Sequence, residues 1–173
     1  MKRELLIKKV IEENNYKTIV EVGTYRGQFA KHLHSTNPNK LYLVDPWKKF
    51  GKDVFPDYTQ YEQDKWDLLY ESVKAKFNYD NVTIIRKTSE EAINMFEDNS
   101  IDLVYIDGNY TFDFVKMDLN LWLPKVKKGG MLCGHDYQLS SVTKAVKQFL
   151  EERNLAINLL FSEKHCGTYF IKI

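Results

Sequence analysis

Cysteine, net charge and long apolar runs are all scarce in this sequence. The two cysteines, Cys133 and Cys166, are too few for a disulfide framework and lack C-x-x-C spacing, so a reduced, cytoplasmic compartment is expected. No apolar run approaches the roughly 20 residues that a membrane helix needs. The opening segment mixes Lys, Arg and Glu with apolar residues, a pattern that a secretory signal does not show. We therefore expect no membrane partner.

Positive and negative side chains nearly balance. The chain has 25 Lys and Arg against 24 Asp and Glu, and its formal net charge of +1 gives no bulk reason to expect a nucleic-acid partner. Its 173 residues predict one domain, 1–173, that is large enough to bury a core. Oligomeric state is left open. The aromatic content of 14% is high enough to suggest an aromatic-lined ligand cleft as well as a core.

Residues 18–29 are the stretch around which the rest is organised. Consecutive apolar and β-branched residues predict a strand that is buried on both faces, as in a parallel sheet. Gly23 then permits a turn that a residue with a Cβ would resist, and Gly27 lets the next helix pack closely. The start of a helix presents free backbone N–H groups, so this turn suits a nucleotide-like ligand.

Glu21 decides which nucleotide-like ligand the turn favours. A dinucleotide-binding turn has the spacing G-x-G-x-x-G, whereas this chain has E-x-G-x-x-x-G, with Tyr25 in place of the middle glycine. A carboxylate at the strand end repels a diphosphate and attracts a cation. S-adenosylmethionine (SAM) has no phosphate and carries a positive amino group and a positive sulfonium. The turn therefore favours SAM over NAD.

Strand and helix patterns alternate along the chain, which predicts a doubly wound, Rossmann-like α/β sheet. Ligands bind such sheets beyond the carboxyl ends of the strands. Five charged residues fall at those ends: Glu21, Asp45, Lys87, Asp107 and Asp136. Strands are predicted at 18–22, 40–44, 82–85, 101–106 and 131–133, the last opened by Gly129 and Gly130, and a closing antiparallel hairpin at 157–161 and 168–173.

Asp45 and Ser89 follow the second and third predicted strands. Asp45 lies about 20 residues beyond Gly23, the spacing of an acid that binds a ribose diol through two hydroxyl hydrogens. The alternative is a cap beside Pro46. Thr88 and Ser89 lie where an adenine edge would be, although Ser89 equally suits the N-cap of a short helix through Phe96.

Asp107 and Asp136 end two neighbouring central strands. Converging carboxylates repel one another unless a positive group lies between them, and Mg²⁺ or the sulfonium would meet that need. His135 adds a group that can accept a proton near neutral pH. The bland alternative is that His135 and Asp136 only cap the next turn, as Ser140 or Ser141 is predicted to cap the helix that follows.

Taken together, these motifs resemble the class I SAM-dependent methyltransferases. The similarity is strongest to small members with I-D-G-[DN]-H-[ST]-Y, then W-L-P-K-x-x-x-G-G and G-H-D-Y. This chain has Ile106-Asp107-Gly108-Asn109-Tyr110-Thr111-Phe112, then Trp122-Leu123-Pro124-Lys125, Gly129-Gly130 and Gly134-His135-Asp136-Tyr137. The resemblance implies a seven-stranded sheet of order 3-2-1-4-5-7-6 and methyl transfer, often to oxygen of sugars or other small molecules.

The resemblance also implies roles for particular residues. Glu21, Gly23, Thr24, Tyr25 and Gly27 would hold the methionine end of SAM. Acids after strands four and five bind Mg²⁺ in related oxygen methyltransferases, which points to Asp107 and Asp136 as ligands, Asp107 also bordering SAM. His135 would act as base beside Asp136. Asp45 would contact the ribose, and Thr88 and Ser89 would contact the adenine.

Tyr110 departs from the family pattern, because it stands where the pattern has His, and Phe112 replaces Tyr. A different acceptor, or a SAM-binding regulatory protein without turnover, therefore stays open, as does a nitrogen or carboxyl methyltransferase that needs no metal. Residues 47–80 form a long connection, loop-like through Tyr61 and then helical. Its first part, 47–61, is a predicted lid over a small-molecule acceptor; a surface loop in an oligomer contact is the alternative.

Overall fold

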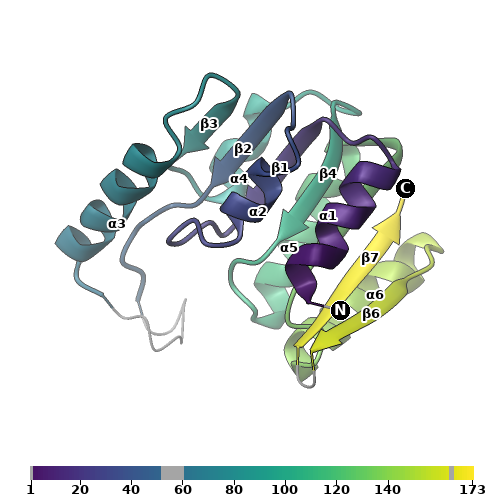
Figure 1. Ribbon diagram of the computed structural model, residues 1–173. Helices are drawn as coiled ribbons and strands as arrows, with labels where there is room; N and C mark the ends of the chain where they lie inside the picture. The colour runs from purple at the N-terminus through teal and green to yellow at the C-terminus, as the bar shows by residue number, and fades with distance from the viewer. Residues whose placement is uncertain (1, 52–60, 164–165) are drawn as a thin grey trace.

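The strands that the structure describes form one sheet, in the order β3-β2-β1-β4-β5-β7-β6 (Figure 1). This computed structural model describes residues 2–51, 61–163 and 166–173. β1 to β5 run parallel, and β7 is antiparallel to both β5 and β6. The predicted doubly wound α/β sheet with an antiparallel strand is confirmed. The strands are β1 (Thr18–Val22), β2 (Lys40–Val44), β3 (Val82–Ile85), β4 (Ile101–Ile106), β5 (Val126–Gly134), β6 (Asn158–Glu163) and β7 (Cys166–Lys172).

Helices cover both faces of this sheet. In Figure 1, α1 lies across the near face, and α5 and α6 lie behind the sheet. None of the helices in the described part of the chain is both long and apolar enough to cross a membrane. The helices are α1 (Arg3–Glu13), α2 (Ala30–His34), α3 (Gln63–Lys76), α4 (Ser89–Ala92), α5 (Phe112–Trp122) and α6 (Ser140–Arg153), with the 3₁₀ turns η1 (Ile93–Met95) and η2 (Leu123–Lys125).

Alternation along the strands creates two cores, one on each face. Successive strand residues point to opposite faces, so Ile19 packs with α1 and α2, whereas Val20 packs with α5 and α6. Both residues are fully buried, which explains why the central strands are almost continuously apolar. By the same alternation Glu21 lies on the Ile19 face, at the carboxyl end of β1.

The structure corrects the predicted boundaries of α4 and α6. Thr88, not Ser89, is the N-cap of α4: its side chain accepts a hydrogen bond from the Glu91 N–H, and Glu91 accepts one from the Thr88 N–H. α4 ends at Ala92 and continues as the 3₁₀ turn η1, so no single helix reaches Phe96. Neither Ser140 nor Ser141 caps α6, whose N-cap is Leu139.

The fifth strand is longer than its sequence pattern predicts. β5 begins at Val126, and Gly129 and Gly130 lie inside it rather than opening it. Gly129 has a positive φ of 82°, and the pairing of β5 with β4 shifts register across this region. An apolar pattern does not reveal a strand interrupted by such a bulge, because the inserted residues break the alternation.

Candidate functional site

The turn after β1 approaches the turn after β4 so closely that only glycine fits at position 23. Gly23 has φ of 88° and its N–H donates to the Val44 carbonyl at 2.9 Å. A Cβ built there would lie 2.3 Å from the backbone oxygen of Asp107 and 2.5 Å from the Cα of Gly108. Both neighbours are backbone atoms, so neither can turn aside. Gly23 therefore lets the ends of β1 and β4 meet at the edge of the site.

Asp45 organises the loops at the ends of β1 and β2. Its Oδ2 accepts from the Tyr25 N–H at 2.8 Å, and its Oδ1 accepts from the Trp47 N–H at 2.7 Å. The Trp47 Nε1–H in turn donates a hydrogen bond to the Tyr25 carbonyl at 2.8 Å. This network holds Tyr25 in a left-handed conformation, φ 50°, that glycine adopts more easily. Burial raises the pKa of Asp45 to about 6, although both N–H groups oppose that rise.

Glu21 is a buried carboxyl group at the floor of the same edge. Its side chain is 1% exposed, and among the described residues its Oε2 finds no hydrogen-bond partner. Burial raises its pKa to about 8 and the nearby acids Asp107 and Asp45 add to the rise, whereas hydrogen bonding to Thr24 opposes it. A buried carboxyl oxygen without a partner is costly to a fold. A cationic ligand would supply the partner that Oε2 lacks.

Helix α5 and the turn after β3 bring a third buried acid to the site. Asp118 lies on the buried face of α5, is 4% exposed, and lies close enough to Ser89 for the Ser89 hydroxyl to hydrogen-bond to it. The Ser89 Oγ accepts from the Trp122 Nε1 at 3.2 Å. Burial raises the pKa of Asp118 to about 7.

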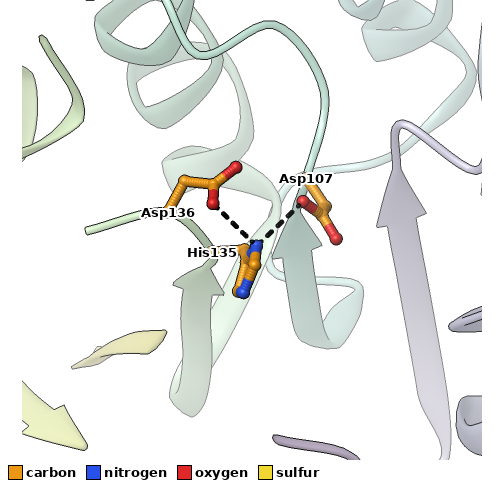
Figure 2. Close-up of side chains that lie close together, drawn as sticks. All are labelled: Asp107, His135 and Asp136. Carbon is orange, nitrogen blue, oxygen red and sulfur yellow. Dashed lines mark ion pairs between the residues drawn. The ribbon is translucent and has the colours of Figure 1, made fainter. Parts of the chain in front are cut away.

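Asp107, His135 and Asp136 meet at the ends of β4 and β5. Figure 2 shows the His135 ring between the two carboxylates, with its Nδ1 3.1 Å from Asp136 Oδ1 and 3.5 Å from Asp107 Oδ1. Burial alone would lower the pKa of His135, but hydrogen bonding to Asp107 and Asp136 raises it to about 9. The positive charge that two converging carboxylates require is therefore supplied by His135 at neutral pH.

Arg3 adds a second positive charge from the first turn of α1. Its Nη1 donates to Asp107 Oδ2 at 2.9 Å, and its guanidinium lies 4.5 Å from the centre of the Phe29 ring. Asp107 is thus paired on both oxygens, with Arg3 on one side and His135 on the other. Arg3 was not among the residues that the sequence analysis singled out.

These groups border one cleft of about 560 Å³ at the carboxyl ends of the strands. That volume is in the range of small-molecule and cofactor sites. Gly27 and His135 are absent from the lining: Gly27 packs beneath the Phe77 ring, and His135 lies behind the carboxylates. The other predicted site residues all line the cleft: Glu21, Gly23, Thr24, Tyr25, Asp45, Thr88, Ser89, Asp107 and Asp136.

The predicted lid divides into parts with different surroundings. Trp47 is fully buried and belongs to the core rather than to a cover. Lys48, Lys49, Phe50 and Tyr61 line the cleft. Residues 52–60, the middle of the predicted lid, lie outside the described residues.

A known protein family matches the part of the chain that forms the cleft. Residues 20–137 match a protein family described as a methyltransferase domain, a span that runs from β1 to the turn after β5. The chain belongs to this family. Arg3, on α1, lies outside the matched span, which is one reason why family motifs do not point to it.

Relatives of this methyltransferase domain are longer than the chain itself. An uncharacterized protein, y4gI, of Sinorhizobium fredii is 33% identical over 78% of this chain, which spans 14% of that protein. A protein named probable caffeoyl-CoA O-methyltransferase 1, from Dictyostelium discoideum, is 29% identical over 72% of this chain and 50% of its own length.

A solved structure shares the fold at low identity. The O-methyltransferase TomG from Streptomyces achromogenes, solved in complex with SAM, superposes with a TM-score of 0.70 at 11% identity, covering 99% of this chain and 79% of that one. At this identity the similarity concerns the fold alone.

Asp118 is the site residue that sequence reasoning missed although a signal existed. The methyltransferase domain buries Val115, Leu119 and Trp122 on one face of α5, and position 118 falls in the same stripe. A charged residue in an apolar stripe is unusual, because burying it is costly. Such an exception to the pattern indicates a functional or a tightly paired group.

Proposed function

We propose that this methyltransferase domain transfers a methyl group from SAM to a hydroxyl group of a small-molecule acceptor. The observation that carries the proposal is the buried Glu21 carboxyl, whose Oε2 lacks a partner within the described structure and which borders the cleft beside Gly23. A cationic ligand without phosphate satisfies this group, whereas a diphosphate would place negative charge against it. Bound SAM supplies a methyl group on a positive sulfonium.

The cleft residues fit the parts of SAM in order along the strand ends. Glu21 accepts from the ammonium group of the methionine part, and Thr24 and Tyr25 border that part of the cleft. Asp45 holds the ribose diol with the lone pairs that its two backbone N–H bonds leave free, since a carboxylate offers about four. Thr88 and Ser89 border the adenine. An O-methyltransferase of the same fold was solved in complex with SAM, which supports SAM as the ligand.

The donor set at β4 and β5 fits a divalent cation in spacing. One ligand atom each from Asp107, His135 and Asp136 lies within 4.8 Å of the others. Carboxylate oxygens are the ligands that Mg²⁺ prefers, so we propose Asp107 and Asp136 as the residues that would hold it. A cation there would lower the pKa of an acceptor hydroxyl.

His135 is our proposed proton acceptor, with Asp136 orienting its ring. A pKa of about 9 leaves only a minor fraction of neutral imidazole at pH 7, and that fraction takes the hydroxyl proton. The ion pair between His135 Nδ1 and Asp136 Oδ1 at 3.1 Å fixes the orientation of the ring. Lys48, Phe50 and Tyr61, which line the cleft, are our proposed contacts for a cover over the acceptor.

Thermal unfolding with SAM, S-adenosylhomocysteine (SAH) or NAD, each with and without Mg²⁺, tests the proposal. A ligand that binds only the folded state at a hundred times its Kd adds about 2.7 kcal/mol of stability. For a chain of this length that corresponds to a rise in Tm of roughly 5–10 °C. We expect the rise with both SAM compounds and none with NAD.

Other outcomes bear on the cofactor, on the metal site and on turnover. A rise with NAD alone, or with none of the three, contradicts SAM as the cofactor. A further rise with Mg²⁺ supports Asp107 and Asp136 as ligands, and it should vanish in Asp136→Asn. Binding of SAM without methyl transfer to any hydroxyl compound would favour a regulatory SAM-binding protein, the alternative that Tyr110 raises.

The affinity for SAH should increase with pH between 6 and 8. Glu21 has a pKa of about 8 in the free protein, and a bound ammonium favours its ionised form, so binding releases a proton below pH 8. Glu21 contributes up to about a tenfold decrease in Kd per pH unit below 8 and nothing above it.

Calorimetric titration of Glu21→Gln across this range isolates the contribution of Glu21. The variant should bind SAH more weakly at pH 8 and lose part of the slope that wild type shows. Glu13→Gln changes an exposed acid on α1 and should leave slope and affinity as in wild type. An unchanged slope in Glu21→Gln would show that Glu21 does not contact the ammonium group.

A further inference from the structure

Asp118 is a buried carboxyl group that the proposed methyl transfer does not use. Asp118 is only 4% exposed. In the part of the chain that is described, its Oδ1 has no hydrogen-bond partner. It nevertheless lines the cleft, next to Ser89 and Glu90. A buried carboxyl oxygen without a partner needs an explanation, and because Asp118 lines the cleft, a donor that a ligand supplies provides one.

A chain of hydrogen bonds fixes Asp118 as an acceptor. The Trp122 indole N–H can only donate, and it donates to the Ser89 Oγ at 3.2 Å. Ser89 therefore keeps its own proton to donate, and Asp118 is the carboxyl group whose pKa the Ser89 hydroxyl lowers. The direction runs from Trp122 through Ser89 to Asp118, which leaves Oδ1 to accept from a further donor.

Asp118 lies at the part of the cleft where the adenine of a bound nucleoside would lie. Ser89 follows β3, two strands along the sheet edge from β1, and Asp45 lies at the end of β2 between them. A nucleoside whose ribose lies at Asp45 would extend its base toward Ser89 and Asp118. Gly108 and Tyr110, after β4, line the same cleft.

We propose that Asp118 recognises the exocyclic amino group of the adenine and so determines which purine the site accepts. This inference rests on the proposed SAM site and adds a residue that sets its specificity. A 6-amino purine donates to the Asp118 carboxylate. A 6-oxo purine presents a carbonyl oxygen, which the same carboxylate repels and which leaves Oδ1 without a partner.

The test compares SAH with S-inosylhomocysteine, which differs from SAH by a 6-oxo group in place of the 6-amino group. Calorimetric titration of wild type should show SAH binding about a hundredfold more tightly, since a site built around a donor rejects the analogue that lacks it. Asp118→Asn is nearly isosteric, and its carboxamide can turn an N–H toward the 6-oxo group. The ratio of the two Kd values should fall to about one.

Asp113→Asn provides the matched control, because Asp113 is an exposed acid on the same helix and its variant should retain the wild-type ratio. Ser89→Ala offers a second route should Asp118→Asn fail to fold: without the hydroxyl that directs Asp118, the ratio should also fall.

Each outcome bears on a distinct claim. Equal binding of both compounds by wild type, or a hundredfold preference that survives in Asp118→Asn, overturns the inference while the SAM site stands. Failure of wild type to bind either compound overturns the proposed SAM site, and the inference with it.

Discussion

Gly23→Ala should abolish SAH binding and strongly destabilise the fold. The substitution places a Cβ 2.3 Å from the Asp107 backbone oxygen and forces a residue with a side chain into φ of 88°. The left-handed conformation costs roughly 1–2 kcal/mol, and overpacking against atoms that cannot move costs roughly 1–3 kcal/mol more. We expect a loss of about 3 kcal/mol or more in urea unfolding, and no rise in Tm with SAH.

Gly129→Ala separates the two sources of that loss. Gly129 has φ of 82°, almost the same as Gly23, but a Cβ there would meet no atom within 4 Å. It should therefore show only the conformational cost, about 1–2 kcal/mol, and bind SAH normally. Equal losses in the two variants would mean that the close approach of the β1 and β4 turns is not what requires glycine at position 23.

Asp45→Ala should give the second largest effect, because this carboxylate supports both the loops and the proposed ribose contact. The variant leaves the N–H groups of Tyr25 and Trp47 without their acceptor. A buried N–H group left without an acceptor costs about 1–3 kcal/mol, so the two together predict a loss of about 2 kcal/mol or more in urea unfolding. SAH binding should weaken at least a hundredfold.

Asp102→Ala is the control for stability without a role in the cleft. Asp102 Oδ2 also accepts from two backbone N–H groups, those of Lys17 and Thr18 at 2.8 and 2.7 Å, but at the opposite end of the sheet. The two variants should lose similar stability, and only Asp45→Ala should lose SAH affinity. Wild-type affinity in a folded Asp45→Ala protein would refute the ribose assignment.

Local sequence patterns predict the strand arrangement of this chain. Apolar runs predicted the position of the central strands, and β2, β3 and β4 begin and end where those runs do. Each strand is bounded by residues next to it in the sequence, and burial on both faces requires an apolar residue at nearly every position. The sheet-edge rule then placed Asp45 and Asp107 near Glu21, since parallel strands end at one edge.

Capping chemistry was less predictable than the strands. Thr88 and Ser89 can both cap a helix, and the choice of Thr88 depends on whether Glu91 can reach back to its N–H. That geometry fixes Ser89 one position inside α4, where its hydroxyl can reach Trp122 and Asp118. Because the cap lies one residue earlier than predicted, Ser89 does not cap α4 and its hydroxyl is part of the proposed adenine site.

The α/β class, the carboxyl ends of the central strands and the acidic character of the cleft can all be predicted from local sequence, because they follow from neighbouring residues and from parallel pairing. The balance of those charges depends instead on how distant segments pack together. Arg3 meets Asp107 across 104 positions of sequence, and His135 sits as a cation between Asp107 and Asp136. A charge pair between distant segments leaves no periodic trace in the sequence, since it depends on how helices pack against the sheet rather than on local pattern.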